Sequence, residues 1–402
     1  MGRFDSPGQI WLYRTKPQDD ELFSSWLVRL ASGLALKLQT FTTQVLKLHS
    51  GFWTGDIDRV PNTRALERLC DGTGVSPERA RATGLAAYEG LLWEAYKSLG
   101  PMAWLTPIGR NGRYRELYGQ QYCRRCLEED GRPYFRRKWR LAFNVLCEAH
   151  GTLLQDACPL CGAPVEFHTG DFGQRLLEFE CQITRCGFCR GDFRQWTGNV
   201  DRFASRQLVD FQRSLNEAIK QGFHDGLPGA RSYSHLLFDG LRHIVQLLCS
   251  RGRFVRARDV LLASNGLLSF EMNLDTRWQK FEALRVGDRA FVLDMARQLM
   301  CNWPSVFVEL CRSSRVSSSY ALRYPNDLPY WFSSEVKWYL EDRDYAPCDE
   351  EREAVRSYLI KNNLSSTRNN INRWLGVSSV SKLIRKRSDR VTRWNPRGPT
   401  RS

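Results

Sequence analysis

The sequence of 402 residues contains no long apolar run. A helix that crosses a membrane needs about 20 predominantly apolar residues, so none is predicted. The N-terminus lacks the charged and then apolar segments of a secretory signal. The 13 cysteines are an odd number, which argues against a framework of disulfides. These absences favour a soluble protein of the reducing cytoplasm.

Several signatures of enzymes are also missing. The sequence has no glycine-rich nucleotide-binding loop, no H-E-x-x-H and no G-x-S-x-G. It also lacks the combination of H-x-E and P-C-x-x-C that marks a zinc deaminase. No cluster of carboxylates has a spacing useful for catalysis. A non-catalytic protein is therefore predicted, and a zinc-dependent enzyme acting on nucleic acid is the rival hypothesis.

Acidic residues are nearly absent from the C-terminal end. Between Lys361 and Ser402, Asp389 is the one acidic residue against eleven basic ones, so this segment carries +10 of the total formal charge of +15. Concentrated positive charge gains free energy by releasing counterions from a phosphate backbone. The segment therefore predicts binding to nucleic acid. A disordered basic tail that only aids solubility is the alternative.

Pairs of metal-ligand residues are concentrated between residues 123 and 189. Each pair has two residues between its members, so both ligands can converge on one ion from a single backbone turn. The pairs are Cys123 with Cys126, Cys147 with His150, Cys158 with Cys161, and Cys186 with Cys189. Zn²⁺ accepts four such nitrogen and sulfur ligands in a tetrahedron. Eight ligands thus predict two structural zinc ions.

The order of the pairs favours sequential sites. Site one would take the first two pairs and site two the last two, while a cross-braced arrangement of the same ligands stays open. Protein ligands fill both sites, which leaves no open position for a catalytic water. Cys181 is interpreted as a spare buried thiol, and His168 as a surface or packing residue.

Apolar periodicity predicts helices outside the cysteine-rich part. The predicted fold is mainly α. It has a helical N-terminal part with a helix-turn-helix, a central double zinc module with short β-hairpins, and a helical C-terminal domain with a second helix-turn-helix. The expected domains are residues 1–118, 119–200, 201–345 and 346–402.

Two regions besides the C-terminus offer basic side chains to DNA. In residues 63–84, a helix, a glycine-containing turn and a second helix, 76–83, form the first helix-turn-helix pattern, and the second helix presents Arg79 and Arg81. Helical bundles share this pattern, so contact with DNA or with protein stays open. Between the ligand pairs of site one, Arg136 and Arg137 alternate with aromatic residues and are predicted to lie outside and contact DNA.

The C-terminal end carries the stronger helix-turn-helix pattern. Helices are predicted over 350–361, from a cap at Ser365 to Leu375, and from a cap at Ser378 onward. The third helix concentrates the charge and would be the recognition helix. The side chains predicted to reach bases or phosphates are Ser379, Ser381, Lys382, Arg385, Lys386 and Arg387.

The segment 121–164 combines the ligand pairs with a particular set of neighbours. These are Tyr122-Cys123-Arg124-Arg125-Cys126-Leu127, Pro133-Tyr134-Phe135-Arg136-Arg137, Trp139-Arg140-Leu141-Ala142, Cys147-Glu148-Ala149-His150-Gly151 and Cys158-Pro159-Leu160-Cys161-Gly162. With them the chain resembles the TniQ family of transposition proteins, which includes the TnsD-type target selectors. The start of the chain from Pro17 to Leu30 and the Asn302-Trp303-Pro304 segment are also similar to that family.

The resemblance implies a bacterial, cytoplasmic and nucleoid-associated protein that selects a target site for transposition without catalysing it. Such a protein would bind double-stranded DNA and recruit an AAA+ ATPase regulator of the TnsC or TniB type. Other members of the family sit as dimers on a CRISPR effector complex, Cascade, whose guide RNA reads the sequence. Both roles remain open, as does a homodimer. A zinc-containing transcriptional regulator is a further alternative.

Overall fold

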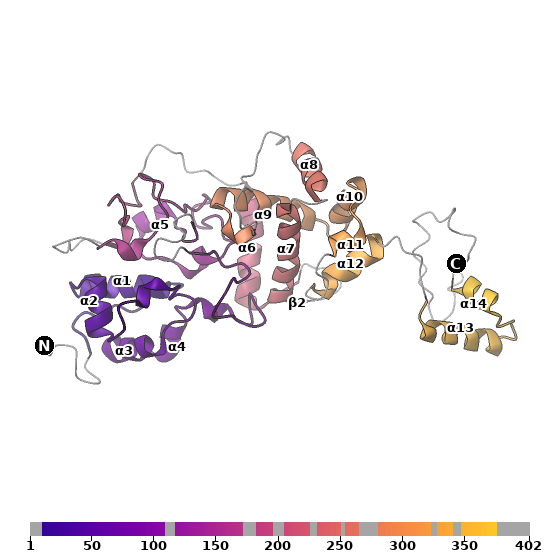
Figure 1. Ribbon diagram of the computed structural model, residues 1–402, viewed down its shortest axis with the longest axis horizontal. Coiled ribbons are helices and arrows are strands. Elements are labelled where there is room, and N and C mark those ends of the chain that lie inside the picture. Colours follow the sequence, from indigo (N-terminus) through magenta and orange to yellow (C-terminus); the bar gives the residue numbers. More distant parts are fainter. Residues whose placement is uncertain are drawn as a thin grey trace. The chain divides into compact units, whose positions relative to one another are not determined.

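A computed structural model describes residues 10–108, 117–171, 182–195, 205–225, 231–250, 254–264, 280–322, 328–340 and 347–375 (Figure 1). The chain divides into two compact units, Met1–Leu340 and Glu341–Ser402. Helices dominate both, so the predicted mainly α class is confirmed. In the described ranges, no helix combines the length and the apolar character needed to cross a membrane.

The first unit consists mainly of helices. The α-helices are α1 (Phe23–Gly33), α2 (Leu38–Thr40), α3 (Thr63–Thr73), α4 (Pro77–Arg81), α5 (Arg124–Glu129), α6 (Arg206–Gln221), α7 (Ser234–Cys249), α8 (Phe254–Ser264), α9 (Val286–Met300), α10 (Ser305–Ser313), α11 (Ser318–Ala321) and α12 (Tyr330–Leu340). Shorter helical turns are η1 (Phe41–Val45), η2 (Phe52–Thr54), η3 (Leu85–Tyr88), η4 (Arg137–Arg140), η5 (Phe167–Thr169), η6 (Gln182–Thr184) and η7 (Phe281–Ala283). Strands β1 (Phe223–His224) and β2 (Ser232–Tyr233) pair antiparallel.

Helix α1 is buried over most of its length, from Phe23 to Ala31. Its start is held from two sides. The Leu22 amide donates to the Phe135 carbonyl at 2.9 Å, and the Phe23 amide donates to the Thr83 carbonyl at 3.0 Å. The N-terminal helices and the cysteine-rich region are therefore joined through α1.

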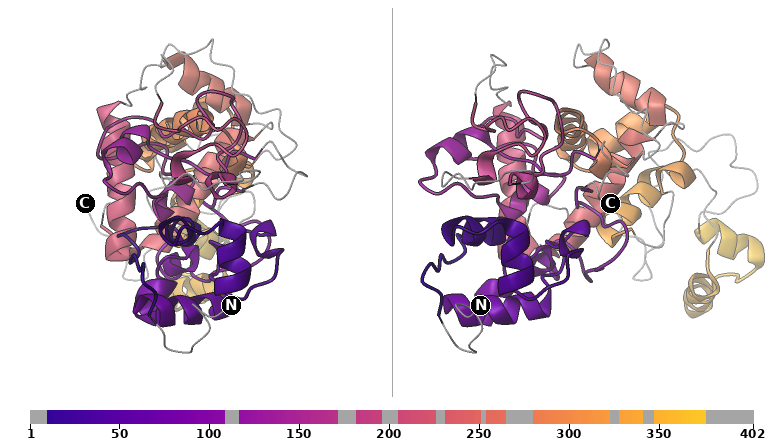
Figure 2. Two further views of the ribbon diagram at one scale, coloured as in Figure 1. Left: turned by 90° about the vertical axis from the view of Figure 1, so that its left-hand side faces the viewer. Right: turned by 60° about the vertical axis from the view of Figure 1, so that its left-hand side comes forward.

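Helices α6, α7 and α9 lie side by side and form the scaffold beyond the cysteine-rich region (Figure 1, Figure 2). Their apolar stripes are buried, as the periodicity predicts. One continuous apolar core includes residues from Trp11 to Leu340. The first three predicted domains thus share a core.

The predicted β-hairpins of the zinc module are present in minimal form. Each consists of a tight turn closed by one antiparallel bridge, and the bridges join Leu146 to Leu153, Ala157 to Pro164, and Arg185 to Asp192. The strands β1 and β2 belong to the scaffold, where they connect α6 to α7.

The second unit contains α13 (Asp349–Lys361) and α14 (Arg368–Trp374). Its apolar core consists of Val355, Leu359, Ile371 and Leu375, with Trp374 packed against them. Helix α14 begins three residues after the predicted cap, because Thr367 rather than Ser365 precedes its first turn. The predicted third helix from Ser378 onward lies outside the described residues.

Candidate metal centres and nucleic-acid contacts

The first ligand cluster joins the start of α5 to a tight turn. Cys123 immediately precedes α5 and Cys126 lies in its first turn. Cys147 and His150 lie in a turn that closes when the Gly151 amide donates to the Cys147 carbonyl at 2.8 Å. Gly151 has φ of +65°, a value that favours glycine. The chain therefore forms this ligand pair with local geometry alone.

The second cluster is built from two turns of the same kind. The Gly162 amide donates to the Cys158 carbonyl at 3.0 Å, and the Arg190 amide donates to the Cys186 carbonyl at 3.0 Å. Gly162 has φ of +71° and Arg190 has φ of +66°. Arg190 thus occupies the left-handed position that glycine takes in the other turns. Its side chain donates a hydrogen bond to the Gly170 carbonyl, which ties this turn to η5.

The eight predicted ligands gather in the sequential arrangement. Cys123, Cys126, Cys147 and His150 form one cluster, and Cys158, Cys161, Cys186 and Cys189 form the other. Within each cluster, all ligand atoms lie within 4.8 Å of one another. The first and second pairs share one cluster and the third and fourth pairs share the other, so the cross-braced alternative is not the arrangement in this structure.

The ligand distances fit a tetrahedral metal. With metal–sulfur and metal–nitrogen bonds of about 2.3 and 2.0 Å, the edges of a tetrahedron measure about 3.8 Å between sulfurs and about 3.5 Å between sulfur and nitrogen. In the first cluster the Cys126 and Cys147 sulfurs are 3.5 Å apart, and the His150 Nδ1 lies 3.3–3.6 Å from the three sulfurs. In the second, Cys158 to Cys189 is 3.6 Å and Cys161 to Cys186 is 3.8 Å. Both clusters could hold a metal ion.

Two other predictions about this region have different outcomes. None of the cysteines that the structure describes forms a disulfide, and Cys181 lies outside the described residues. His168 belongs to neither cluster, because its ring stacks on Trp53 with the centroids 5.4 Å apart. Burial lowers the pKa of His168 to about 4, so this side chain packs as a neutral ring. The interpretation of His168 as a packing residue is confirmed.

An outer carboxylate orients the single histidine ligand. The Nε2 of His150 lies 2.9 Å from the Glu129 carboxylate, while Nδ1 faces the three cysteines. A carboxylate in this position fixes the ring and raises the basicity of the ligating nitrogen. Glu129 follows Cys126 by one turn of α5, so the same helix supplies a ligand and the support of another ligand.

We expect Glu129→Gln to weaken metal binding at the first cluster by about tenfold, because an amide orients the imidazole less strongly than a carboxylate does. Glu128→Gln is the matched control, since Glu128 pairs with Arg124 on the exposed side of α5. Competition with a chromogenic chelator would measure both affinities. Equal affinities of the two variants would show that Glu129 does not tune this cluster.

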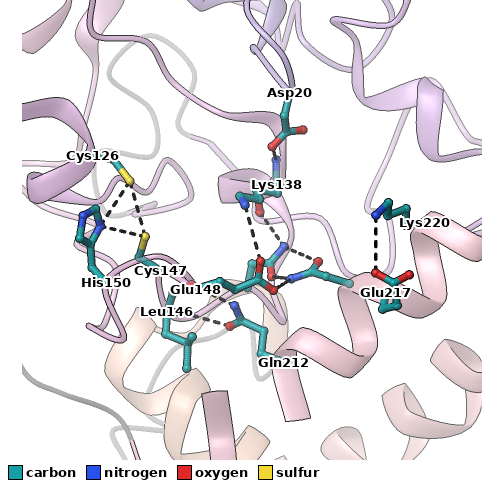
Figure 3. A network of polar contacts seen from close by, with 12 residues as sticks. Asp20, Cys126, Lys138, Leu146, Cys147, Glu148, His150, Gln212, Glu217 and Lys220 are labelled. Carbon is teal, nitrogen blue, oxygen red and sulfur yellow. Dashed lines mark hydrogen bonds and ion pairs between the residues drawn. The ribbon is translucent and has the colours of Figure 1, made fainter. Parts of the chain in front are cut away.

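Helix α6 holds the turn of the first cluster through a side chain that the sequence did not single out. Gln212 is buried, and its carbonyl accepts the Val145 and Leu146 amides at 2.8 and 3.1 Å. Its amide nitrogen donates to the Leu146 carbonyl at 2.9 Å, directly before Cys147 (Figure 3). Sequence reasoning could not identify this role, because the apolar periodicity of this segment predicts only a helix.

Arg136 and Arg137 differ from the prediction that they lie outside. Arg136 forms a two-pronged ion pair with Asp130, at 2.9 and 3.2 Å, and its side chain is 14% exposed. Arg137 pairs with Asp20 at 3.3 Å and is 17% exposed. Both arginines are largely covered. Burial is tolerated because Asp130 and Asp20 neutralise their charges. Phe135 and Trp139, which flank them in the sequence, are buried.

The predicted N-terminal contacts lie on α4, a helix of five residues that is shorter than expected. Gly74 ends α3 with φ of +69°, and the Ser76 hydroxyl accepts the Arg79 amide as a cap. The Arg79 guanidinium donates to the Pro17 carbonyl at 2.9 Å, which ties α4 to the N-terminal segment. Arg81 is 62% exposed beside Glu78, so it is the more accessible of the two.

The predicted contacts Ser379, Ser381, Lys382, Arg385, Lys386 and Arg387 lie outside the described residues. The structure therefore neither brings the C-terminal set together nor separates it. What it describes of the C-terminal unit is the pair α13 and α14, which would precede the predicted recognition helix.

The model of the TniQ family matches residues 12–154 of the chain. Residues 12–154 are a TniQ region. This region runs from the N-terminal helices through all four ligands of the first cluster and ends before Cys158. The resemblance predicted from the sequence is thus confirmed for this part of the chain. No curated protein matches the chain.

Proposed function

We propose that this TniQ protein is a non-catalytic factor that selects target sites for transposition. It binds double-stranded DNA and recruits an AAA+ ATPase regulator of the TnsC or TniB type to the insertion site. The TniQ region is the observation that carries this proposal. The basic C-terminal segment supports the DNA-binding part, because its charge favours a phosphate backbone.

Zinc is the metal that we propose for both clusters. Three thiolates with one imidazole, and four thiolates, are the ligand sets typical of structural zinc sites. Iron–sulfur chemistry also uses four cysteines, but the histidine of the first cluster favours zinc there. Metal analysis of the purified protein should give two zinc ions per chain.

Two rival functions make different predictions. A zinc enzyme would lose turnover on chelation and keep its fold, whereas structural sites lose the fold itself. A zinc-containing transcriptional regulator would bind DNA without retaining the ATPase. The proposed function therefore predicts that the protein bound to DNA retains an ATPase of the TnsC or TniB type in a pull-down.

The test of DNA recognition is selection from a pool of random duplexes with the full-length protein at several salt concentrations. One enriched motif would support a site reader of the TnsD type. Salt-sensitive binding without a motif would favour the alternative. In that case a TniQ subunit docks as a dimer on a Cascade complex, and the guide RNA specifies the target site. Failure to bind any duplex at low salt would refute a direct role on DNA.

We expect Arg385→Ala with Lys386→Ala to lower DNA affinity and to reduce the slope of log affinity against log salt by about 2, because two phosphate contacts are lost. Fluorescence anisotropy with a duplex would measure both quantities. Arg397→Ala with Arg401→Ala removes the same charge nearer the end of the chain and should change the slope less. Equal changes in both variants would indicate a generic basic tail.

A further inference from the structure

A cavity of about 470 Å³ lies where three parts of the first unit meet. The end of α1 forms one wall, the loop after α5 forms the second, and the segment around the last turn of the second cluster forms the third. Its lining is rich in guanidinium groups. The residues that matter for binding are Tyr13, Arg29, Ser32, Arg132, Arg185 and Arg194. We call this cavity the arginine pocket.

The arginines of the pocket fall into two classes. Arg29 pairs with the buried Glu21, and Arg194 pairs with Asp192 at 2.7 Å. These ion pairs hold both side chains in place and offset part of their charge. Within the part of the chain that the structure describes, Arg132 and Arg185 form no ion pair or hydrogen bond through their guanidinium groups, so their N–H groups are available to a ligand.

The acidic groups around the pocket are already neutralised. Asp130 also lines it, but both of its oxygens accept from Arg136. Asp192 faces two cations, since Arg194 binds it directly and the charge of Arg185 further lowers its pKa. The excess of positive charge therefore points to an anionic ligand.

An aromatic ring stands at the edge of the same pocket. Tyr13 is half-buried and packs on the backbone of Gly33, where a Cβ atom would lie 1.8 Å from the ring. Only glycine permits this close approach. A flat ring held beside paired and unpaired guanidiniums is the combination that binds a phosphate together with its sugar or base.

We propose that the arginine pocket binds a backbone phosphate of a nucleic-acid strand through Arg132 and Arg185, with the adjoining nucleoside against Tyr13. This inference rests on the proposed DNA-binding function and adds a contact in the first unit to those predicted at the C-terminus. The volume favours this ligand over an acidic side chain, because a carboxylate alone would leave most of the space empty. Ser32 supplies a hydroxyl on the same wall.

The test is the affinity of full-length Arg132→Gln with Arg185→Gln for a 20-base-pair duplex, measured by anisotropy over a range of salt. We expect a loss of about tenfold and a slope reduced by about 1, because one phosphate contact is lost. Arg206→Gln with Lys220→Gln is the charge-matched control, since both side chains are exposed on α6. The control should change affinity by less than about twofold. Metal content and melting temperature of the pocket variant should equal those of the wild type.

The outcomes separate the hypotheses. A wild-type protein that does not bind the duplex would refute the proposed function. A wild type that binds, together with equal losses in both double variants or no loss in the pocket variant, would refute the arginine pocket alone. Poly-L-glutamate serves as a second probe. If the pocket variant loses binding to it but keeps its affinity for DNA, the pocket takes an acidic polypeptide, and the proposal is overturned.

Discussion

Replacing Cys126 with serine should release one metal ion per chain and unfold the TniQ region. Binding to a structural site of this kind contributes about 10–16 kcal/mol of folding free energy in isolated peptides, and loss of one thiolate removes a large part of it. Cys126 is 7% exposed and belongs to the continuous core. The destabilisation should therefore extend beyond the turn into the core and lower the melting temperature by about 10 °C or more.

Cys161→Ser provides a graded comparison at the second cluster. Cys161 is exposed, whereas three of the four ligands of the first cluster are buried. Both substitutions should lower the metal content, but Cys161→Ser should cost less stability because less of the core depends on its turn. Cys301→Ser is the control, since Cys301 is exposed and belongs to neither cluster.

Metal content by mass spectrometry and thermal unfolding by circular dichroism would measure these effects. A soluble Cys126→Ser protein with unchanged metal content and unchanged melting would contradict a structural metal at the first cluster. An unchanged melting temperature together with a loss of metal would show instead that the shared core folds without the ion.

The metal clusters could be predicted from the sequence because their geometry is local. Two ligands separated by two residues converge through one turn, and Gly151 and Gly162 follow directly where the left-handed conformation is needed. Arg190 breaks this pattern, yet its turn has the same hydrogen bond. The spacing of the ligands therefore predicts these turns more generally than the glycine that follows them.

The contacts between distant segments could not be predicted in this way. Arg137 lies in a basic and aromatic stretch typical of nucleic-acid binding, but its partner Asp20 is far away in the sequence. Gln212 contacts Leu146, which is also far away in the sequence. Neither pairing follows from periodicity or spacing, because each depends on how α1 and α6 pack against the cysteine-rich region. For the same reason, the expected boundary at residue 118 does not interrupt the core.

Arg140→Met should destabilise the protein by about 3–5 kcal/mol, because it leaves buried carboxylates without their cation. Arg140 is fully buried and forms a two-pronged pair with Asp56, at 2.7 and 3.2 Å. It also lies 3.6 Å from the buried Asp58, which accepts the Ser24 amide and hydroxyl at the start of α1. The guanidinium therefore connects η4 to the N-terminal helices.

The stability lost on Arg140→Met should increase with pH. Burial and the charge of Asp56 raise the pKa of Asp58 to about 7, while Arg140 opposes this rise. Without Arg140 the pKa should rise further above the value of about 3.9 for an unfolded aspartate. The folded variant then holds a proton that the unfolded chain releases, so its free energy of unfolding falls as the pH increases from about 4 through 7. Chemical denaturation should show a larger loss of stability for Arg140→Met at pH 8 than at pH 5.

Arg213→Met, which breaks the exposed pair with Asp210, is the control and should change stability by less than about 0.5 kcal/mol at either pH. A penalty for Arg140→Met as small as that of this control would show that the buried pairs do not hold the TniQ region together.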